Sequence, residues 1–250
     1  MTRFYILLLI ALLLAALALA LEQPALAAIV GFVLLVIIGL GVTFPQLSLF
    51  GRYVCRGNPA QRHVALTFDD GPDARSTPAL LDLLRQEHLA ATFFGIGRRV
   101  TAEPELAARI VRDGQLLENH SYAHSHTTNF FTVARLKAEL TQAQTAITQA
   151  TGMAPKLFRP PMGLSNPRVF CVARALDLQV IGWSARGLDT QTHDPERVVA
   201  RIVRRLSPGA IILLHDGNIP AARLVLTVRL LLTKLREHGY EVVRLDQMLK

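Results

Sequence analysis

Residues 64–72 read VALTFDDGP, a short apolar run that stops at two adjacent carboxylates. The run has the length and the apolar, aromatic content of a buried β-strand. Asp69 and Asp70 then lie at its carboxyl end, where two negative charges repel each other unless a cation or separate roles relieve the repulsion. The Gly71-Pro72 pair that follows favours a turn, so this stretch alone is compatible with an ordinary loop.

Further strands of this kind follow along the chain and alternate with amphipathic helical patterns. The sequence predicts seven strands, at residues 64–68, 91–96, 115–119, 156–158, 179–183, 210–214 and 241–243. It predicts six helices between them, at residues 77–88, 104–113, 132–150, 166–176, 195–206 and 221–238. Because strands that alternate with helices form parallel sheets, the expected class is α/β and the favoured architecture is a closed barrel.

Polar residues gather just beyond the ends of these strands, where barrels of parallel strands carry their functional sites. They are Asp69 and Asp70, His120 and His124, Arg159, Asp189, and His215. His120 and His124 stand four residues apart, so on a helical turn they would lie on one face and could share a metal. Each motif alone is also explained by a turn, a surface residue or the core. Together they supply carboxylates, histidines and an arginine at one edge of the barrel.

In combination and order, these motifs resemble the polysaccharide deacetylase family, also called the NodB-homology family or carbohydrate esterase family 4. The resemblance extends from about Arg62 to the C-terminus. It rests on five segments, at residues 67–71 (TFDDG), 120–124 (HSYAH), 159–163 (RPPMG), 183–189 (WSARGLD) and 213–215 (LLH). It implies a distorted (β/α)7 barrel, which agrees with the predicted strand count, and residues 51–250 would form this deacetylase domain.

The resemblance implies a catalytic divalent metal with three protein ligands. These would be Asp70, His120 and His124, and the metal would be zinc, with cobalt, nickel or manganese as alternatives. Three protein ligands leave a coordination position open, as a catalytic site requires. Asp69 would be the general base that deprotonates the attacking water, and Arg159 would hold that carboxylate in place.

The resemblance also implies a general acid and a wall for the substrate. His215 would protonate the leaving amine, and Asp189 would orient it. Leu213 would line the pocket for the acyl methyl group beside Trp183, and the backbone N–H of Met162 would help to bind the oxyanion. An amide requires this division of roles because its carbonyl is a poor electrophile and its amine leaves only when protonated.

Two positions near Trp183 depart from the family's pattern. Arg186 stands where the family frequently has an aspartate, and Thr190 stands where it frequently has a tryptophan. Asp189 keeps its place, so the catalytic set is complete. The substrate groove is therefore expected to differ from the groove that family members use for polymers.

The first 50 residues form a separate hydrophobic unit. Residues 4–21 and 25–44 are almost purely apolar, and each segment has about the 20 residues that cross a bilayer. Only Glu22-Gln23-Pro24 separates them, so the favoured interpretation of residues 1–50 is a membrane anchor of two transmembrane helices. A signal peptide that ends at the small residues 25–27 is the alternative interpretation.

The basic residues that flank the hairpin predict its orientation. Arg3 precedes it, Arg52, Arg56 and Arg62 follow it, and its turn holds no Lys or Arg. The positive-inside rule then predicts a multi-pass protein of the bacterial inner membrane with its catalytic domain in the cytoplasm. A periplasmic domain is the alternative, because only a few arginines decide the orientation.

The net charge of +8 does not indicate nucleic acid as a partner. The arginines are scattered through helical patterns and fit a solvated face near anionic lipids, so membrane lipids are the expected partners besides the substrate. Cys55 and Cys171 lack metal-ligand spacing and are expected to be buried free thiols. No pattern predicts the oligomeric state.

These features together predict a metal-dependent hydrolase that removes an N-acetyl or N-formyl group from an amino sugar. The substrate would be a lipid-linked or a polymeric glycan, and a lipid-linked sugar at the inner leaflet suits the anchor. A catalytically inactive, membrane-anchored sugar-binding module is the alternative. Retention of Asp69 favours the enzyme, because binding alone requires no general base.

Overall fold

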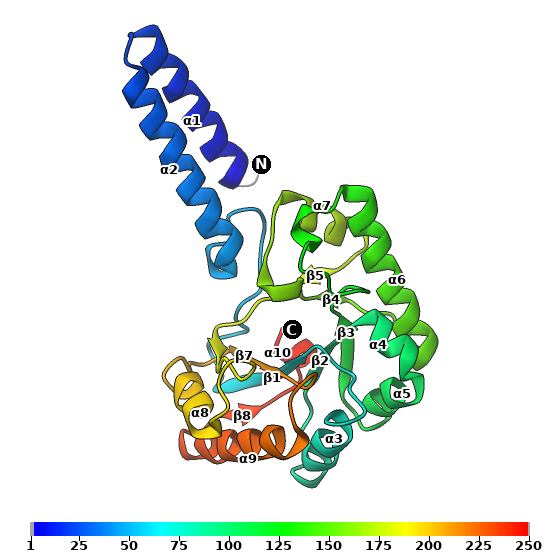
Figure 1. Cartoon of the computed structure of the whole chain (residues 1–250). Coiled ribbons are helices and arrows are strands. Elements are labelled where there is room, and N and C mark those ends of the chain that lie inside the picture. Colours follow the sequence, from blue (N-terminus) through cyan, green and yellow to red (C-terminus); the bar gives the residue numbers. More distant parts are fainter. Residues whose placement is uncertain (1–2, 250) are drawn as a thin grey trace.

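A computed structural model describes residues 3–249 of the chain (Figure 1). Two antiparallel helices, α1 (Arg3–Ala20) and α2 (Pro24–Thr43), project from a body that holds the strands. Both are long and apolar enough to cross a membrane, and within them only Ala18 and Gly41 are buried. The expected hairpin is therefore present, and its exposed apolar surface shows that neither helix belongs to the core of the body. Such helices could serve as a membrane anchor or as a signal sequence.

The predicted anchor (residues 1–50) and the predicted domain (residues 51–250) extend slightly beyond the described part of the chain. Residues 1, 2 and 250 lie outside it.

Eight strands form one sheet within residues 3–249. They are β1 (His63–Asp69), β2 (Thr92–Gly95), β3 (Leu116–Asn119), β4 (Leu157–Phe158), β5 (Gln179–Val180), β6 (Ala185–Arg186), β7 (Ala210–His215) and β8 (Glu241–Val242). Seven of them lie in the order β5-β4-β3-β2-β1-β7-β6, and β8 pairs with the beginning of β1. All these pairs are parallel. With its surrounding helices, the sheet is the expected distorted (β/α)7 barrel.

Helices surround this sheet (Figure 1). They are α3 (Thr77–Gln86), α4 (Gly97–Ala102), α5 (Pro104–Arg112), α6 (Val133–Thr151), α7 (Pro167–Ala175), α8 (Pro195–Val203), α9 (Ala221–Glu237) and α10 (Leu245–Met248), with short 3₁₀ turns η1 (Pro45–Leu47), η2 (Thr128–Phe130) and η3 (Pro161–Gly163). The side chains of Thr132, Asn166 and Asp194 accept hydrogen bonds from first-turn amides and so fix where α6, α7 and α8 begin. All six predicted helices are present.

The barrel is closed by the linker (residues 44–56), which leaves the hairpin, rather than by a further strand. The backbone N–H of Val54 donates to the carbonyl of Val180 at 2.9 Å, and the Val54 carbonyl accepts from the N–H of Gly182 at 3.0 Å. Arg56 then forms an antiparallel bridge with the start of β7. The linker therefore occupies the gap between β5 and the β6–β7 pair and forms part of the barrel wall.

Several elements differ from the sequence-based expectation. Helix α10 was not predicted, because its four residues are too few to give a helical period. The strand predicted at residues 179–183 ends at Val180, because the following residue, Ile181, pairs with the linker. The short β6 was not predicted, since two residues that include the charged Arg186 give no alternating pattern. Helix α4 was not predicted either, because its six residues are too few to show a helical period and begin with a glycine, a poor helix former.

The register of the strands brings their carboxyl ends to one level. Asp69, the last residue of β1, lies opposite His215, the last residue of β7. On its other side Asp69 lies opposite Phe94 of β2, and β3 ends one residue before His120. Apolar clusters pack around these strands, so the strand ends present their polar side chains from a close-packed support.

Cys55 and Cys171 are both free thiols, as expected, but the expectation that both are buried is wrong. Cys171 is exposed because α7 packs through Val169, Val172 and Ala173, which places residue 171 on the solvent side. Cys55 is half-buried in the linker.

Candidate active site

A cavity of about 360 Å³ opens at the carboxyl ends of the strands; we call it the strand-end cleft. Its walls include all the predicted site residues but one, namely Asp69, Asp70, His120, His124, Met162, Trp183, Asp189, Leu213 and His215. The remaining residue, Arg159, is fully buried and contacts Asp69. The structure thus brings together side chains that the sequence spreads over almost 150 residues.

Arg159 holds the buried carboxylate of Asp69. Nη1 of Arg159 donates to Asp69 Oδ1 at 2.6 Å and to the hydroxyl of Thr67 at 2.8 Å. Nη2 donates to the carbonyl of Gly182 at 3.0 Å, and the guanidinium lies 4.2 Å from the ring centroid of Phe94. These contacts fix the guanidinium, which in turn fixes Asp69. The other carboxylate oxygen of Asp69, Oδ2, lies 3.8 Å from Nε2 of His120.

His120 and His124 do not lie on a helical turn, contrary to the sequence-based expectation. They belong to a loop in which Ser121 and His124 have positive φ angles of 62° and 49°. The N–H of Ser121 donates to Asn119 Oδ1 at 2.8 Å, and the N–H of His124 donates to Ser121 Oγ at 3.1 Å. Side-chain bonds of this kind compete with helix formation. The loop nevertheless brings the two imidazole centroids within 4.8 Å of each other.

Asp70 joins the two imidazoles in a cluster that fits a divalent metal. Its Oδ1 lies 3.5 Å from Nε2 of His120 and 3.3 Å from Nε2 of His124. Nδ1 of His120 lies 2.7 Å from the carbonyl oxygen of Arg159, and because a carbonyl only accepts, this nitrogen carries a proton. In its neutral form, which is the form in which histidine binds metals, His120 would present a lone pair at Nε2 toward Asp70.

The unpaired oxygen of Asp70 also points to a cation. Asp70 Oδ1 is buried and accepts no hydrogen bond from any described residue, an arrangement that is unfavourable unless a positive charge meets it. Burial and the nearby His120 lower the pKa of His124 to about 4, which keeps its imidazole neutral and able to act as a ligand. The three ligand atoms lie within 4.8 Å of one another, and zinc accepts this set of oxygen and nitrogen donors.

His215 and Asp189 form a second charged pair on the strand-end cleft. Nδ1 of His215 lies 2.9 Å from Asp189 Oδ1, and the backbone N–H of His215 donates to Asp189 Oδ2 at 2.8 Å. Burial alone would lower the pKa of His215, but the hydrogen bond to Asp189 and the charges of Asp189, Asp69 and Asp70 raise it to about 9. The imidazole of His215 therefore carries a proton at neutral pH.

Met162 and Gly163 shape the rim of the strand-end cleft. Both residues of the η3 turn have positive φ angles, 57° and 68°, and the Met162 side chain is 43% exposed. A side chain at position 163 would collide with the indole of Trp183, so the glycine is what allows Trp183 to pack against this turn. Leu213 of β7 completes the apolar part of the wall.

Sequence reasoning missed part of the cleft wall. Leu188 and Gln191 line the strand-end cleft beside Thr190 and Arg186. They stand in an irregular segment where Leu188 has a positive φ of 59°, so no period marks which side chains face the cleft. One signal in the sequence indicated that these residues line the cleft, namely their position within two residues of Asp189.

Asp216, directly after His215, was also given no role. It is fully buried, its Oδ2 accepts a hydrogen bond from the Thr77 hydroxyl at 2.6 Å, and its backbone N–H donates to the Asp69 carbonyl at 3.0 Å. Burial raises its pKa to about 7. Asp216 thus joins the two strand ends that carry Asp69 and His215.

Known proteins share this fold and these segments. Residues 56–181 match the family model for polysaccharide deacetylase. The chain is 33% identical over 192 residues to a peptidoglycan-N-acetylglucosamine deacetylase of Bacillus cereus, a match that covers 76% of this chain and 89% of that protein. It is also 33% identical over 199 residues to a chitooligosaccharide deacetylase of a Bradyrhizobium species. That match covers 75% of this chain and 90% of the relative.

The fold also matches the crystal structure of a CE4 family pseudoenzyme from Bacillus anthracis, with a TM-score of 0.74 and 28% sequence identity. This match covers 80% of this chain and 69% of that chain. The structural match shows the shared barrel, and the match to the Bacillus cereus protein extends over most of its length. This chain therefore belongs to the polysaccharide deacetylase family, carbohydrate esterase family 4.

Proposed function

We propose that this protein is a metal-dependent hydrolase that removes an N-acetyl or N-formyl group from an amino sugar. The main support is the arrangement of the strand-end cleft, where three candidate metal ligands lie together. Beside them lie the carboxylate of Asp69, held by Arg159, and the imidazole of His215, held by Asp189. A base and an acid beside a cation site are the groups that amide hydrolysis requires. The family relationship supports carbohydrate N-deacetylation as the class of reaction.

The metal would be held by Asp70, His120 and His124, with zinc as the expected ion and cobalt, nickel or manganese as alternatives. When bound, a divalent metal supplies positive charge that polarises the acyl carbonyl and lowers the pKa of a water molecule. The protonated Nδ1 of His120, held by a backbone carbonyl, would keep Nε2 directed at that position.

Asp69 would accept the proton of the attacking water. Arg159 binds one of its oxygens and leaves the other free, so the base is positioned before the substrate arrives. The backbone N–H of Met162 would donate to the developing oxyanion, and Leu213 and Trp183 would contact the acyl group and the sugar.

His215 would protonate the leaving amine. Its raised pKa keeps the proton available at neutral pH, and the bond to Asp189 occupies Nδ1 and leaves Nε2 as the donor. The leaving amine is a strong base, so departure requires this proton.

The hairpin would anchor the enzyme in the bacterial inner membrane as a multi-pass protein. Phe4 supports a retained first helix, because its N–H donates to the Leu49 carbonyl at 3.1 Å and its ring centroid lies 5.2 Å from that of Phe50. The basic flanks favour a domain in the cytoplasm, with the periplasm as the alternative.

A lipid-linked sugar is the substrate that we favour over a polymer. The hairpin joins the barrel directly, which suits a substrate held in the same bilayer. Arg186 and Thr190, which replace the family's frequent residues, both line the strand-end cleft. The two relatives are named for peptidoglycan and for chitooligosaccharide, so the family does not favour a single glycan.

An inactive sugar-binding module is the second candidate, because a structural neighbour is a pseudoenzyme. Two features support the enzyme instead. The strand-end cleft holds three candidate metal ligands, and it also holds the Asp69–Arg159 pair.

The test is mass spectrometry of the lipid-linked sugars from cells that carry the native protein or the Asp69→Ala variant, with metal analysis of the purified full-length protein. We expect bound zinc and, in the variant, a precursor heavier by one acyl group. Metal-loaded native protein that releases no acyl group from any N-acylated sugar would instead establish the inactive module.

A further inference from the structure

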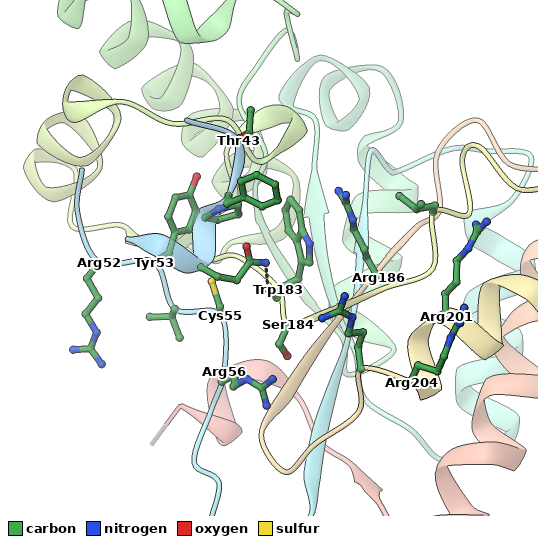
Figure 2. A pocket seen from close by; sticks show the side chains of 16 residues that line it. Thr43, Arg52, Tyr53, Cys55, Arg56, Trp183, Ser184, Arg186, Arg201 and Arg204 are labelled. Carbon is green, nitrogen blue, oxygen red and sulfur yellow. Dashed lines mark hydrogen bonds between the residues drawn. The ribbon is translucent and has the colours of Figure 1, made fainter. Parts of the chain in front are cut away.

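A second and larger cavity, of about 1000 Å³, lies where the hairpin meets the barrel (Figure 2). Thr43 and Phe44, at the end of α2, form one part of its wall. The linker and Trp183 form another part, and Nε2 of Gln46 donates to the Trp183 carbonyl at 3.0 Å. The cavity therefore opens at the level where the apolar hairpin ends.

Six arginines line this cavity, and we call it the arginine cavity. They are Arg52, Arg56, Arg186, Arg201, Arg204 and Arg205. The lining contains no aspartate and no glutamate. Six positive charges in one cavity repel one another, so an anion that enters it is strongly favoured.

These guanidinium groups have no acidic partners in the described part of the chain. Arg56 donates only to the Ser207 hydroxyl, and Arg201 donates to Gly187 and Thr192, all of which are neutral. Within residues 3–249 the other four form neither an ion pair nor a side-chain hydrogen bond. The donors that match phosphate geometry are therefore free.

The helix dipole explains part of this charge but not all of it. Three of the arginines come from the end of α8, where basic side chains are common because they interact favourably with the last carbonyls. Arg52 and Arg56 come from the linker, and Arg186 comes from β6. In Figure 2 the two linker arginines lie on one side of Trp183, and Arg186, Arg201 and Arg204 lie on the other.

The arginine cavity adjoins the strand-end cleft. Trp183, Arg186 and Leu188 line both. A molecule whose sugar occupies the cleft could therefore place its next group in the arginine cavity and its tail against the hairpin. Headgroups of bulk lipids would need no connection to the cleft, so this continuity favours a substrate over general membrane adhesion.

We infer that the arginine cavity binds the phosphate or diphosphate group that joins the substrate's amino sugar to its lipid. This inference rests on the proposed N-deacylation and specifies the substrate class as an anionic, phosphate-linked glycolipid. It applies to either leaflet of the membrane.

The binding test uses farnesyl diphosphate as the probe and the full-length protein in a neutral detergent. The Arg204→Gln/Arg205→Gln variant removes two of the free guanidinium groups. The matched control is Arg112→Gln/Arg174→Gln, because both of those residues are exposed, unpaired within the described chain and near helix ends. We expect calorimetry to show affinity about tenfold weaker for the cavity variant, as two modest contacts would give, and native affinity for the control.

Three further ligands distinguish the sources of the phosphate. Farnesol, which lacks the charge, is expected to bind no better to the native protein than to the cavity variant. Inorganic pyrophosphate that binds as tightly as farnesyl diphosphate would overturn the inference in favour of a free-anion site. Displacement of the probe by an equal concentration of phosphatidylglycerol would overturn it in favour of general lipid headgroups.

A kinetic test separates this inference from the proposed reaction. Acyl release is measured on one N-acetylated sugar carried either by a prenyl diphosphate or by a neutral octyl glycoside. We expect the cavity variant to raise KM about tenfold for the first substrate only, with kcat unchanged. Equal KM values for the variant and the native enzyme on the first substrate would refute the arginine cavity and leave N-deacylation intact. If the native enzyme releases no acyl group from either substrate, the proposed reaction is refuted. The calorimetry would still test whether the arginine cavity binds a diphosphate.

Discussion

The strand-end cleft and the arginine cavity share a wall, yet their charges are organised in opposite ways. In the cleft, Asp69 pairs with Arg159 and His215 pairs with Asp189, and all four side chains are largely buried. In the arginine cavity, most guanidinium groups lack a partner in the described chain and remain exposed. Paired, buried charges hold reacting groups in one geometry, whereas unpaired, hydrated charges can meet a ligand that arrives from outside. The cleft is thus suited to chemistry and the cavity to capture.

The largest effect is expected from Asp69→Asn, which removes the proposed base and keeps its shape. The amide oxygen can still accept from Arg159, so the barrel should fold and should bind metal through Asp70, His120 and His124. Loss of a positioned base lowers kcat about 10² to 10⁴-fold. Acyl release from the octyl glycoside measures the loss, and metal analysis with a thermal melt provides the control. A variant with more than a tenth of native kcat would remove Asp69 from the mechanism.

Removal of Arg159 is expected to affect stability most. Arg159→Met leaves the Asp69 carboxylate buried without its partner, which costs about 3–5 kcal/mol of folding free energy. Thermal unfolding in detergent measures this change. The double variant with Asp69→Asn should recover most of the loss, because the uncompensated charge is gone. A double variant no more stable than Arg159→Met would show that the lost packing, and not the charge pair, dominates.

A change in pH dependence is expected from Asp189→Asn. In the native protein the pKa of His215 is raised to about 9, so its proton is retained at neutral pH and activity falls as the pH rises through about 9. Without the Asp189 charge the pKa of His215 falls, and the alkaline loss of activity moves to lower pH. A kcat profile against pH on the octyl glycoside checks this shift. If the alkaline limb of the kcat profile does not move in Asp189→Asn, the loss of activity at high pH belongs to a group other than His215.

The smallest effect is expected from salt, and it should distinguish the two regions. Raising salt from about 0.1 M to about 1 M shortens the Debye length from about 10 Å to about 3 Å. The exposed arginine cavity should lose attraction for phosphate, so KM for the prenyl diphosphate substrate should rise about threefold to fivefold. The buried pairs of the cleft are screened less, and KM for the octyl glycoside should stay constant. An equal rise in KM for both substrates would contradict the proposed difference between the arginine cavity and the strand-end cleft.

The two regions also differ in how far the sequence predicts them. Asp69, Asp70 and His215 lie at the ends of β1 and β7, the two longest strands, and the barrel rule brings such strand ends together, so these residues could be grouped from their positions in the sequence. The loop of His120 and His124 could not be predicted, because its positive φ angles depend on side-chain bonds to Asn119 and Ser121.

The arginine cavity was beyond sequence reasoning. Its members come from the linker, β6 and the end of α8. The linker and β6 carry no periodic pattern, and the amphipathic pattern of α8 shows only that its arginines lie away from the buried face, not which other arginines they meet. The linker's pairing with Ile181 and β7, which closes the barrel, brings Arg56 to that wall. Scattered arginines therefore resemble a solvated surface until that long-range pairing is known.

The closure of the barrel by the linker also sets how far the enzyme can reach. From Val54 onward the chain is hydrogen-bonded into the barrel wall, and Gln46 already donates to the Trp183 carbonyl, so residues 44–53 are the longest possible connection between α2 and the barrel. Fully extended, ten residues span at most about 35 Å, close to the thickness of one bilayer. If α2 spans the membrane as proposed, this connection would keep the barrel close to the bilayer, and the strand-end cleft would reach only acyl groups in a thin layer beside the lipid surface.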